Sequence, residues 1–241
     1  MLWTLGSIAL FVIGARLIPS RLSATLRAAP VGQIALEAAR FVFYVGLPYA
    51  ALLTGAFAPR DIGLQGSPAP DLILGWTAED WARALGHAAA LGGLTLAVLA
   101  VLAWQIRRGG GSLLAALDID RISVARAIGN GVYAEAHWSF YRALPMLALA
   151  LGEARWAALA GLALVAGEAL LAGRYTETGA QRLSLFEGLL AGLSATYFVL
   201  TGGNLWLAIL LQIVVRVGVS RMIATARSDE SLHEAPEEII V

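Results

Sequence analysis

The stretch EAHWSFYR, residues 135–142, lies inside an otherwise apolar run that extends from Ala127 to Leu151. This run is long enough to cross a bilayer, which takes about 20 apolar residues in a helix. Glu135, His137 and Arg142 interrupt it with ionisable side chains. A charge at the centre of a membrane helix costs about 2.5–3.5 kcal/mol on insertion scales, so such residues normally face a bundle interior and are paired. The stretch therefore predicts a helix surrounded by other helices.

The three ionisable side chains lie on two faces of that helix. At about 100° per residue, Glu135 and Arg142 share one face and are separated by about 10.5 Å along the axis. That separation predicts no direct contact, so each is expected to have a partner on another helix. His137 lies about 200° from Glu135, on the opposite side, with Tyr141 one turn beyond it.

The composition is that of a polytopic membrane protein in contact with the lipid bilayer. Of the 241 residues, 59% are hydrophobic and 14% are charged, whereas a soluble domain carries about 25% charged residues. The 26 glycines suit helices that approach one another closely. The formal net charge is zero, and the absence of a basic face argues against nucleic acid as a partner. The chain has no cysteine, which excludes disulfides and thiolate chemistry.

Apolar segments along the chain predict an all-α polytopic helical bundle with about seven transmembrane helices. Residues 1–119 contain three expected spans and their connectors: Met1–Leu17, Val31–Phe57, in which Pro48 is expected to cause a kink, and His87–Ile106. Residues 120–220 contain the other four: Ala127–Leu151, Trp156–Ala172, Leu183–Leu200 and Leu205–Val219.

Two segments are expected to lie outside the membrane. Residues 58–86 form the larger one, and Thr77 followed by Asp80 resembles a capping box, so a short helix is expected to begin there. Residues 221–241 form a polar, acidic tail that is expected to be disordered apart from a possible short helix.

The distribution of arginine predicts the orientation. Arginines gather in alternate connectors, and the opposite connectors hold only Arg60, Arg83 and Arg155. Because cytoplasmic loops carry an excess of basic residues, the N-terminus is expected outside and the C-terminus in the cytoplasm of a multi-pass protein of the cell membrane.

Polar residues inside the expected membrane region gather in the last four spans. These are Glu135, His137, Arg142, Glu168, Glu187, Gln212 and Arg216. Structural roles are expected for most of them: Arg142 pairs with Glu168 or Glu135, Gln212 makes a hydrogen bond between helices, and Arg216 extends to the cytoplasmic surface. Glu187, near the start of its span, is expected at the interface. Glu168 lies deep in an Ala/Leu/Gly helix and has no local partner in the sequence.

The last four spans resemble the CPBP family, which comprises the type II CAAX prenyl proteases and bacteriocin-processing membrane proteins. The resemblance covers about residues 120–220 and rests on FYRA at 140–143, FEGL at 186–189 and TGGNLWLAI at 201–209. In that family one helix carries Glu-Glu-x-x-x-Arg, the next Phe-x-x-x-His and a later one His-x-x-x-Asn. The resemblance implies a CAAX-protease-like four-helix core, in which glutamates and histidines activate the hydrolytic water, with or without a metal ion.

This chain departs from the family pattern at most motif positions. When Arg142 is aligned with the family arginine, His137 and Trp138 occupy the two glutamate positions. Leu164 and Glu168 replace the second motif, and Gln212 and Arg216 replace the third. We therefore expect a protein that has lost the hydrolytic residues and acts as a membrane module, which binds or stabilises another membrane protein, a lipidated peptide or another lipid-like ligand.

Two alternatives stay open, so the sequence does not establish whether the protein is an enzyme. An active intramembrane endopeptidase would use Glu168 or Glu135 as the base, with His137 as its partner and Arg142 and Gln212 close by. Only that alternative calls for a cofactor, a divalent metal such as zinc held by the histidine and two carboxylates. The opposite orientations of Glu135 and His137 argue against such a shared ion. A small proton-linked transporter would use the same residues as a relay.

Overall fold

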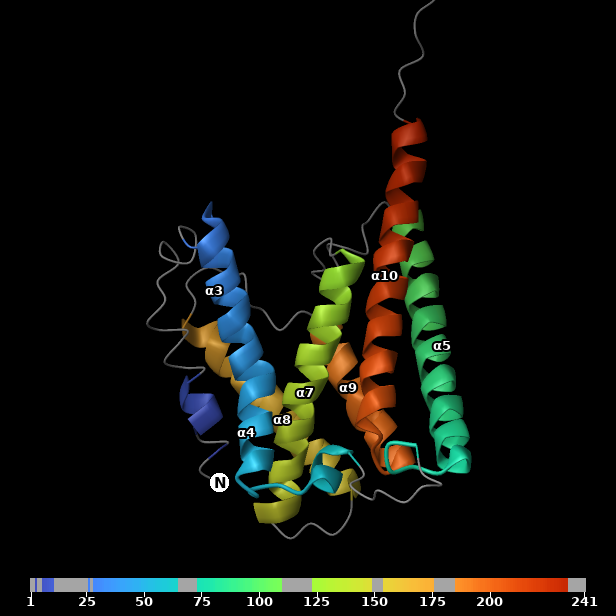
Figure 1. Ribbon diagram of the computed structural model, residues 1–241. Helices are drawn as coiled ribbons and strands as arrows, with labels where there is room; N and C mark the ends of the chain where they lie inside the picture. Colours follow the sequence, from blue (N-terminus) through green and yellow to red (C-terminus); the bar gives the residue numbers. More distant parts are fainter. Residues whose placement is uncertain are drawn as a thin grey trace, which may run out of the picture.

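The computed structural model describes Trp3 and residues 6–10, 26, 28–64, 73–109, 123–148, 154–175 and 185–233 (Figure 1). The elements are α3 (Pro30–Phe41), the π-helix η1 (Val42–Gly46), α4 (Leu47–Leu53), the 3-10 helix η2 (Pro59–Ile62), α5 (Ala78–Arg108), α7 (Val124–Ala148), α8 (Ala154–Tyr175), α9 (Leu185–Thr201) and α10 (Leu205–His233). Within these residues the β structure is limited to an isolated bridge between Ile73 and Trp76. The all-α prediction is therefore confirmed for the described part of the chain.

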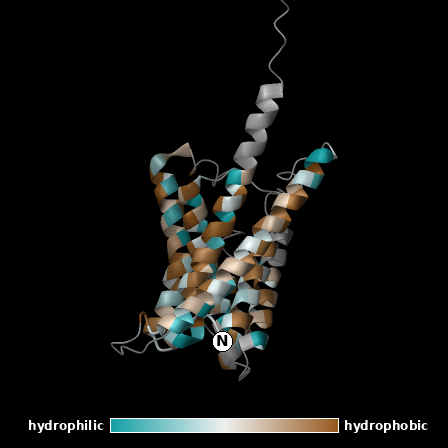
Figure 2. Ribbon diagram, turned by 90° about the vertical axis from the view of Figure 1, so that its right-hand side faces the viewer, coloured by the Kyte–Doolittle hydropathy of each residue, from teal (hydrophilic) through white to brown (hydrophobic). Residues whose placement is uncertain are grey.

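Three helical segments are long and apolar enough to cross a membrane: Pro30–Leu53, Ala78–Arg108 and Leu205–Met222. Phe186–Thr201 is a shorter apolar helix. Hydrophobic residues dominate the middle of the bundle, and hydrophilic ones gather at the ends of several helices (Figure 2). These features are those of a membrane protein, whereas the full set of seven spans stays a prediction.

Helix α5 begins where the sequence predicts but is much longer than expected. The backbone N–H of Asp80 donates to Thr77 Oγ1 over 3.1 Å, and the Thr77 hydroxyl donates to Asp80 Oδ2 over 2.7 Å. The predicted cap is confirmed. The prediction of a short, separate helix is wrong, because α5 continues for 31 residues to Arg108, about 46 Å at 1.5 Å per residue. The Ala-rich sequence after the cap contains no proline that would end it.

The expected distortion at Pro48 takes the form of a π-helix. Residues Val42–Gly46 form η1, and Pro48 follows in the first turn of α4. The Leu47 N–H donates to the Val42 carbonyl five residues back, so the helix continues past Pro48, which has no N–H group. One residue more per turn also rotates the side chains of η1, and π-turns of this kind occur frequently at functional sites.

Helix α7 lies at the centre of the described bundle. It packs against α8 and α10, α8 packs against α9, and α10 packs against both α9 and α5. The helices expected to form the core of residues 120–220 therefore do contact one another. Small residues set the closest approaches: a Cβ atom on Gly161 of α8 would lie 3.0 Å from the Cα atom of Arg142 in α7. Such contacts are typical of helices packed in membranes.

Several helix ends that adjoin arginine-rich connectors lie at the same end of the bundle (Figure 1). Figure 1 shows the start of α3, the end of α5, the start of α7 and the end of α10 at one end of the bundle. These are the ends that adjoin the arginine-rich connectors. Which end faces the cytoplasm stays a prediction.

The C-terminal tail begins as a helix. Helix α10 runs to His233, so the helix allowed for in the tail is a continuation of the preceding span over residues 221–233, while residues 234–241 lie outside the described part. The helix extends because the sequence beyond Arg221 holds neither glycine nor proline before Pro236 and follows directly on a packed helix, to which further turns add without a new nucleation step.

Candidate functional site

The five site residues predicted from the sequence are all buried. The exposed fraction is 0% for Glu135, 2% for His137, 5% for Arg142, 9% for Glu168 and 0% for Gln212. They face the bundle interior, as the cost of a charge in hydrocarbon requires. The structure distributes them over three separate groups rather than one cluster.

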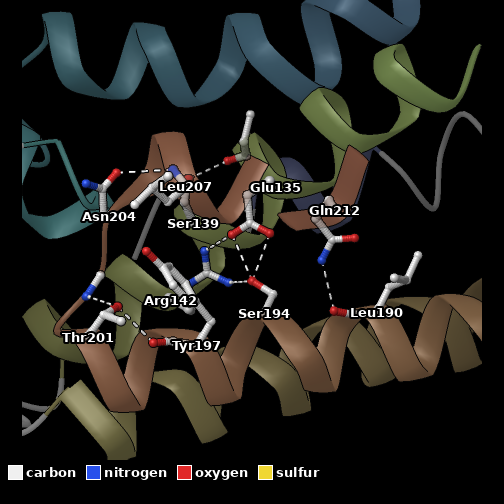
Figure 3. Close-up of polar contacts among 12 residues, drawn as sticks. Glu135, Ser139, Arg142, Leu190, Ser194, Tyr197, Thr201, Asn204, Leu207 and Gln212 are labelled. Atoms are coloured by element: carbon white, nitrogen blue, oxygen red, sulfur yellow. Dashed lines mark hydrogen bonds and ion pairs between the residues drawn. The ribbon is translucent and has the colours of Figure 1, made fainter. Parts of the chain in front are cut away.

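The first group joins Glu135 and Arg142 of α7 to Ser194 of α9 (Figure 3). Arg142 Nη2 donates to Glu135 Oε1, and Arg142 Nη1 donates to Ser194 Oγ over 2.9 Å. Ser194 Oγ lies 2.8 Å from each carboxylate oxygen of Glu135. The prediction that Glu135 and Arg142 are too far apart for contact is wrong. Side chains on a helix lean toward its N-terminus, so the extended Arg142 reaches back over the two turns that separate it from Glu135.

Ser194 is a member of this group that the sequence reasoning missed. Its hydroxyl lies against both the guanidinium and the carboxylate, and its exposed fraction is 1%. The signal that could have found it is helical periodicity, since Phe186, Leu190 and Ser194 are four residues apart and share one face. The two apolar members of that face are buried, so a serine in register with them also points inward.

The second group joins His137 of α7 to Glu168 of α8. His137 Nε2 lies 3.0 Å from Glu168 Oε2. Of the two partners expected for Arg142, the structure has Glu135 and not Glu168, although Glu135 lies on the same helix. Glu168 has its partner on the opposite face of α7. The His137 ring centroid is 5.1 Å from those of Phe43 and Tyr44 and 4.4 Å from that of Tyr141. Because Phe43 and Tyr44 belong to η1, the π-helix supplies one wall of the aromatic enclosure around this pair.

The third group links α10 to α9. Gln212 Nε2 donates to the backbone carbonyl of Leu190 over 2.9 Å (Figure 3), which confirms the predicted hydrogen bond between helices. Arg216 Nη1 and Nη2 donate to Glu187 Oε1 and Oε2 over 2.6 and 2.7 Å. The prediction that Arg216 extends to the surface is wrong, because only 2% of its side chain is exposed. The Glu187 side chain, 37% exposed, lies nearer the surface, as expected.

The carboxylates and the histidine do not fit a zinc site. Glu135 is bound on the α9 side of α7 and His137 on the α8 side, as the helix geometry predicts. Within the described residues no group of three or more His, Cys, Asp or Glu side chains could hold a metal ion. A catalytic zinc takes three protein ligands, and His137 with Glu168 supplies two. Of the residues expected to converge, His137 and Glu168 meet, while Glu135 and Gln212 make their hydrogen bonds to other residues.

Little open space adjoins the first group. A cavity of about 10 Å³ lies beside Arg142, with Trp138, Gly161, Val165 and Ala195 among its lining residues. That volume is about the minimum that one water molecule needs. The ion pair of Glu135 and Arg142 therefore lies next to room for a water, not for a peptide.

Known families, curated proteins and solved structures give no match to this chain. Its function is therefore inferred from the geometry of these three groups and from the motif positions that they occupy.

Proposed function

We propose that this protein is a non-catalytic integral membrane module with a core of the CAAX-protease type, which binds or stabilises another membrane protein or a lipid-like ligand. The supporting observation is that the buried ionisable side chains in the described residues are engaged by partners inside the bundle. Glu135 is held by Arg142 and Ser194. His137 pairs with Glu168 and Arg216 with Glu187.

This use of the side chains is structural rather than hydrolytic. A general base must come within hydrogen-bond reach of the proton that it abstracts, yet both oxygens of Glu135 already lie against the Ser194 hydroxyl. The cavity beside Arg142 has about 10 Å³ of free volume. Glu168 and His137 are 9% and 2% exposed and lie behind aromatic rings. The groups therefore join α7 to α8 and α9, and α9 to α10.

One observation favours the second candidate, an active endopeptidase. With Arg142 aligned to the family arginine, His137 occupies a glutamate position and Glu168 a histidine position, and the two side chains are 3.0 Å apart. Relative to the family motif, the glutamate and the histidine have changed places, and the carboxylate–imidazole pair still joins the same two helices. It supports the resemblance to the CPBP family, and it leaves Glu168 as the base that such an enzyme would use.

Peptide cleavage by the full chain in lipid nanodiscs separates these two functions. Prenylated and transmembrane peptides are incubated with the wild-type protein and with Glu168→Gln, and the products are counted by mass spectrometry. We expect no cleavage by either protein, because Glu168 is enclosed with His137. Cleavage by the wild type that the variant loses would establish the endopeptidase instead.

A second arm tests the binding role directly. The protein is crosslinked in its native membrane and extracted in mild detergent, and the mass of the extracted complex is measured by native mass spectrometry. We expect a complex with a partner or lipid in fixed stoichiometry that persists through extraction. Recovery of the bare chain would contradict the module, and pH-dependent flux into proteoliposomes would indicate the transporter.

A further inference from the structure

A groove of about 600 Å³ opens between α3 and α7. Ile34, Glu37, Phe41 and Val42 line one wall and Tyr133 of α7 lines the other. We call it the α3–α7 groove. Figure 1 shows α3 leaning away from α7 toward its first residue, while the segment below it lies against α7. At that lower end η1 packs on α7.

A charged pair stands beside this groove. Arg40 Nη1 donates to Glu37 Oε1 over 3.3 Å, and Arg40 Nη2 donates to Asn130 Oδ1 over 3.0 Å. The guanidinium carbon lies 5.1 Å from the ring centroid of Tyr133. Side-chain exposure is 40% for Arg40 and 60% for Glu37. A cation anchored to α7 and an anion thus lie side by side, and both are accessible. Because an exposed pair of this kind contributes at most about 1 kcal/mol to stability, a ligand that binds both charges loses little by separating them.

The apolar part of the groove continues from the charges along the chain. Phe41 and Val42 are 52% and 61% exposed, and residues 41–53 contain no charged side chain. Glu37 and Arg40 are the charged residues of α3, and an uninterrupted apolar segment follows them. The charged pair beside the exposed Phe41 and Val42 therefore offers one polar and one apolar surface, as the headgroup and acyl chain of a phospholipid require.

We infer that the α3–α7 groove binds one zwitterionic phospholipid whose headgroup ends in a primary ammonium. The phosphate lies beside Arg40, the ammonium beside Glu37, and an acyl chain along Phe41 and Val42. This inference rests on the lipid-like ligand of the proposed function and adds its chemical class.

The chemistry of the two charges selects this headgroup. A guanidinium carries several N–H donors in a planar fork that suits phosphate, and Arg40 is fixed by Asn130 so that its exposed edge is already oriented. A carboxylate binds best a cation that can donate hydrogen bonds. A primary ammonium donates them to Glu37, whereas a quaternary ammonium has no N–H group. A headgroup with net negative charge would meet repulsion from the same carboxylate.

The test is lipid competition on the purified full chain, measured by native mass spectrometry. Phosphatidylethanolamine, phosphatidylcholine and phosphatidylglycerol with identical acyl chains are offered at equal concentration. The variants are Glu37→Gln and Arg40→Gln. The matched controls are Glu79→Gln and Arg83→Gln, an exposed pair of the same type on α5, 2.6 Å apart. Thermal unfolding is measured for each variant to show that it folds. If Arg40→Gln does not fold, the lipid preference is judged from Glu37→Gln alone, which replaces the more exposed partner.

We expect the wild type and both controls to retain one phosphatidylethanolamine with about tenfold preference over the other two lipids, since a charge-assisted hydrogen bond is worth about that much. Glu37→Gln should lose the preference and Arg40→Gln the bound lipid. Equal retention of all three lipids by the wild type, or a preference that survives Glu37→Gln, would overturn the inference. A partner protein recovered without any retained lipid would also overturn it and would leave the proposed function standing.

Discussion

Replacement of Arg142 by methionine is expected to lower the free energy of unfolding by about 3–5 kcal/mol, the loss typical of a buried ion pair that loses one partner. The variant leaves the Glu135 carboxylate, which is 0% exposed, with Ser194 as its remaining contact in the first group. It also removes the guanidinium that lies 3.6 Å from the centroid of the Phe198 ring. Unfolding of the full chain in bicelles, followed by steric trapping, measures the loss.

Two further variants show that the loss comes from the pair. Arg83→Met removes an arginine whose side chain is 60% exposed in a pair with Glu79 on α5, and should change the free energy by less than about 1 kcal/mol. Glu135→Leu combined with Arg142→Met should recover most of the stability, because no unpaired charge then stays buried. Equal losses for Arg142→Met and Arg83→Met would show that the buried pair does not stabilise the bundle.

Substitution of Gly161 is expected to separate α7 from α8. A Cβ atom there would lie 2.6 Å from Arg142 Cγ and 3.0 and 3.1 Å from the Arg142 Cα and N atoms. Backbone atoms cannot move aside as a flexible side chain can, so Gly161→Ala should cost about 1–3 kcal/mol and Gly161→Leu more. Bicelle unfolding again provides the measurement.

Gly167 supplies the control within the same helix. A Cβ atom on Gly167 would meet nothing within 4 Å. Gly167→Ala should therefore leave stability unchanged or raise it slightly, since alanine favours a helix over glycine by about 1 kcal/mol. If both alanine variants behaved alike, the close approach of α8 to Arg142 would not be a determinant of the fold.

The sequence predicts the type of fold and the burial of the site residues. Both predictions rest on the high free-energy cost of exposing a charged side chain to hydrocarbon. Apolar segments and the Thr77 cap predict helices, and charges such as Glu168 have to turn inward and find partners. The sequence alone does not identify the partner of each charge. A helical wheel places Cα atoms, so it could not show that Arg142 extends along its own helix to Glu135. The contact of His137 with Glu168 depends on how closely α7 and α8 approach, which small residues such as Gly161 set.

Arg216 and α5 show two other limits of the sequence. Nearness to Arg221 along the chain indicated a surface position for Arg216, but its partner, Glu187, lies on a different helix. Only the packing of α10 against α9 brings them together. The sequence analysis placed a membrane boundary near His87 and a short helix before it. Helix-forming residues continue across that boundary without a break, so the two segments form one helix, α5.

The most direct test of cross-helix pairing is a double-mutant cycle on His137 and Glu168. The free energy of unfolding in bicelles is measured for the wild type, His137→Leu, Glu168→Leu and the double variant. Since the two side chains lie 3.0 Å apart in a buried enclosure, each single variant should be destabilised and the double variant should be more stable than the sum of the two losses implies. Losses that add within about 0.3–0.5 kcal/mol, as they do for distant residues, would contradict the pairing of buried polar groups between neighbouring helices.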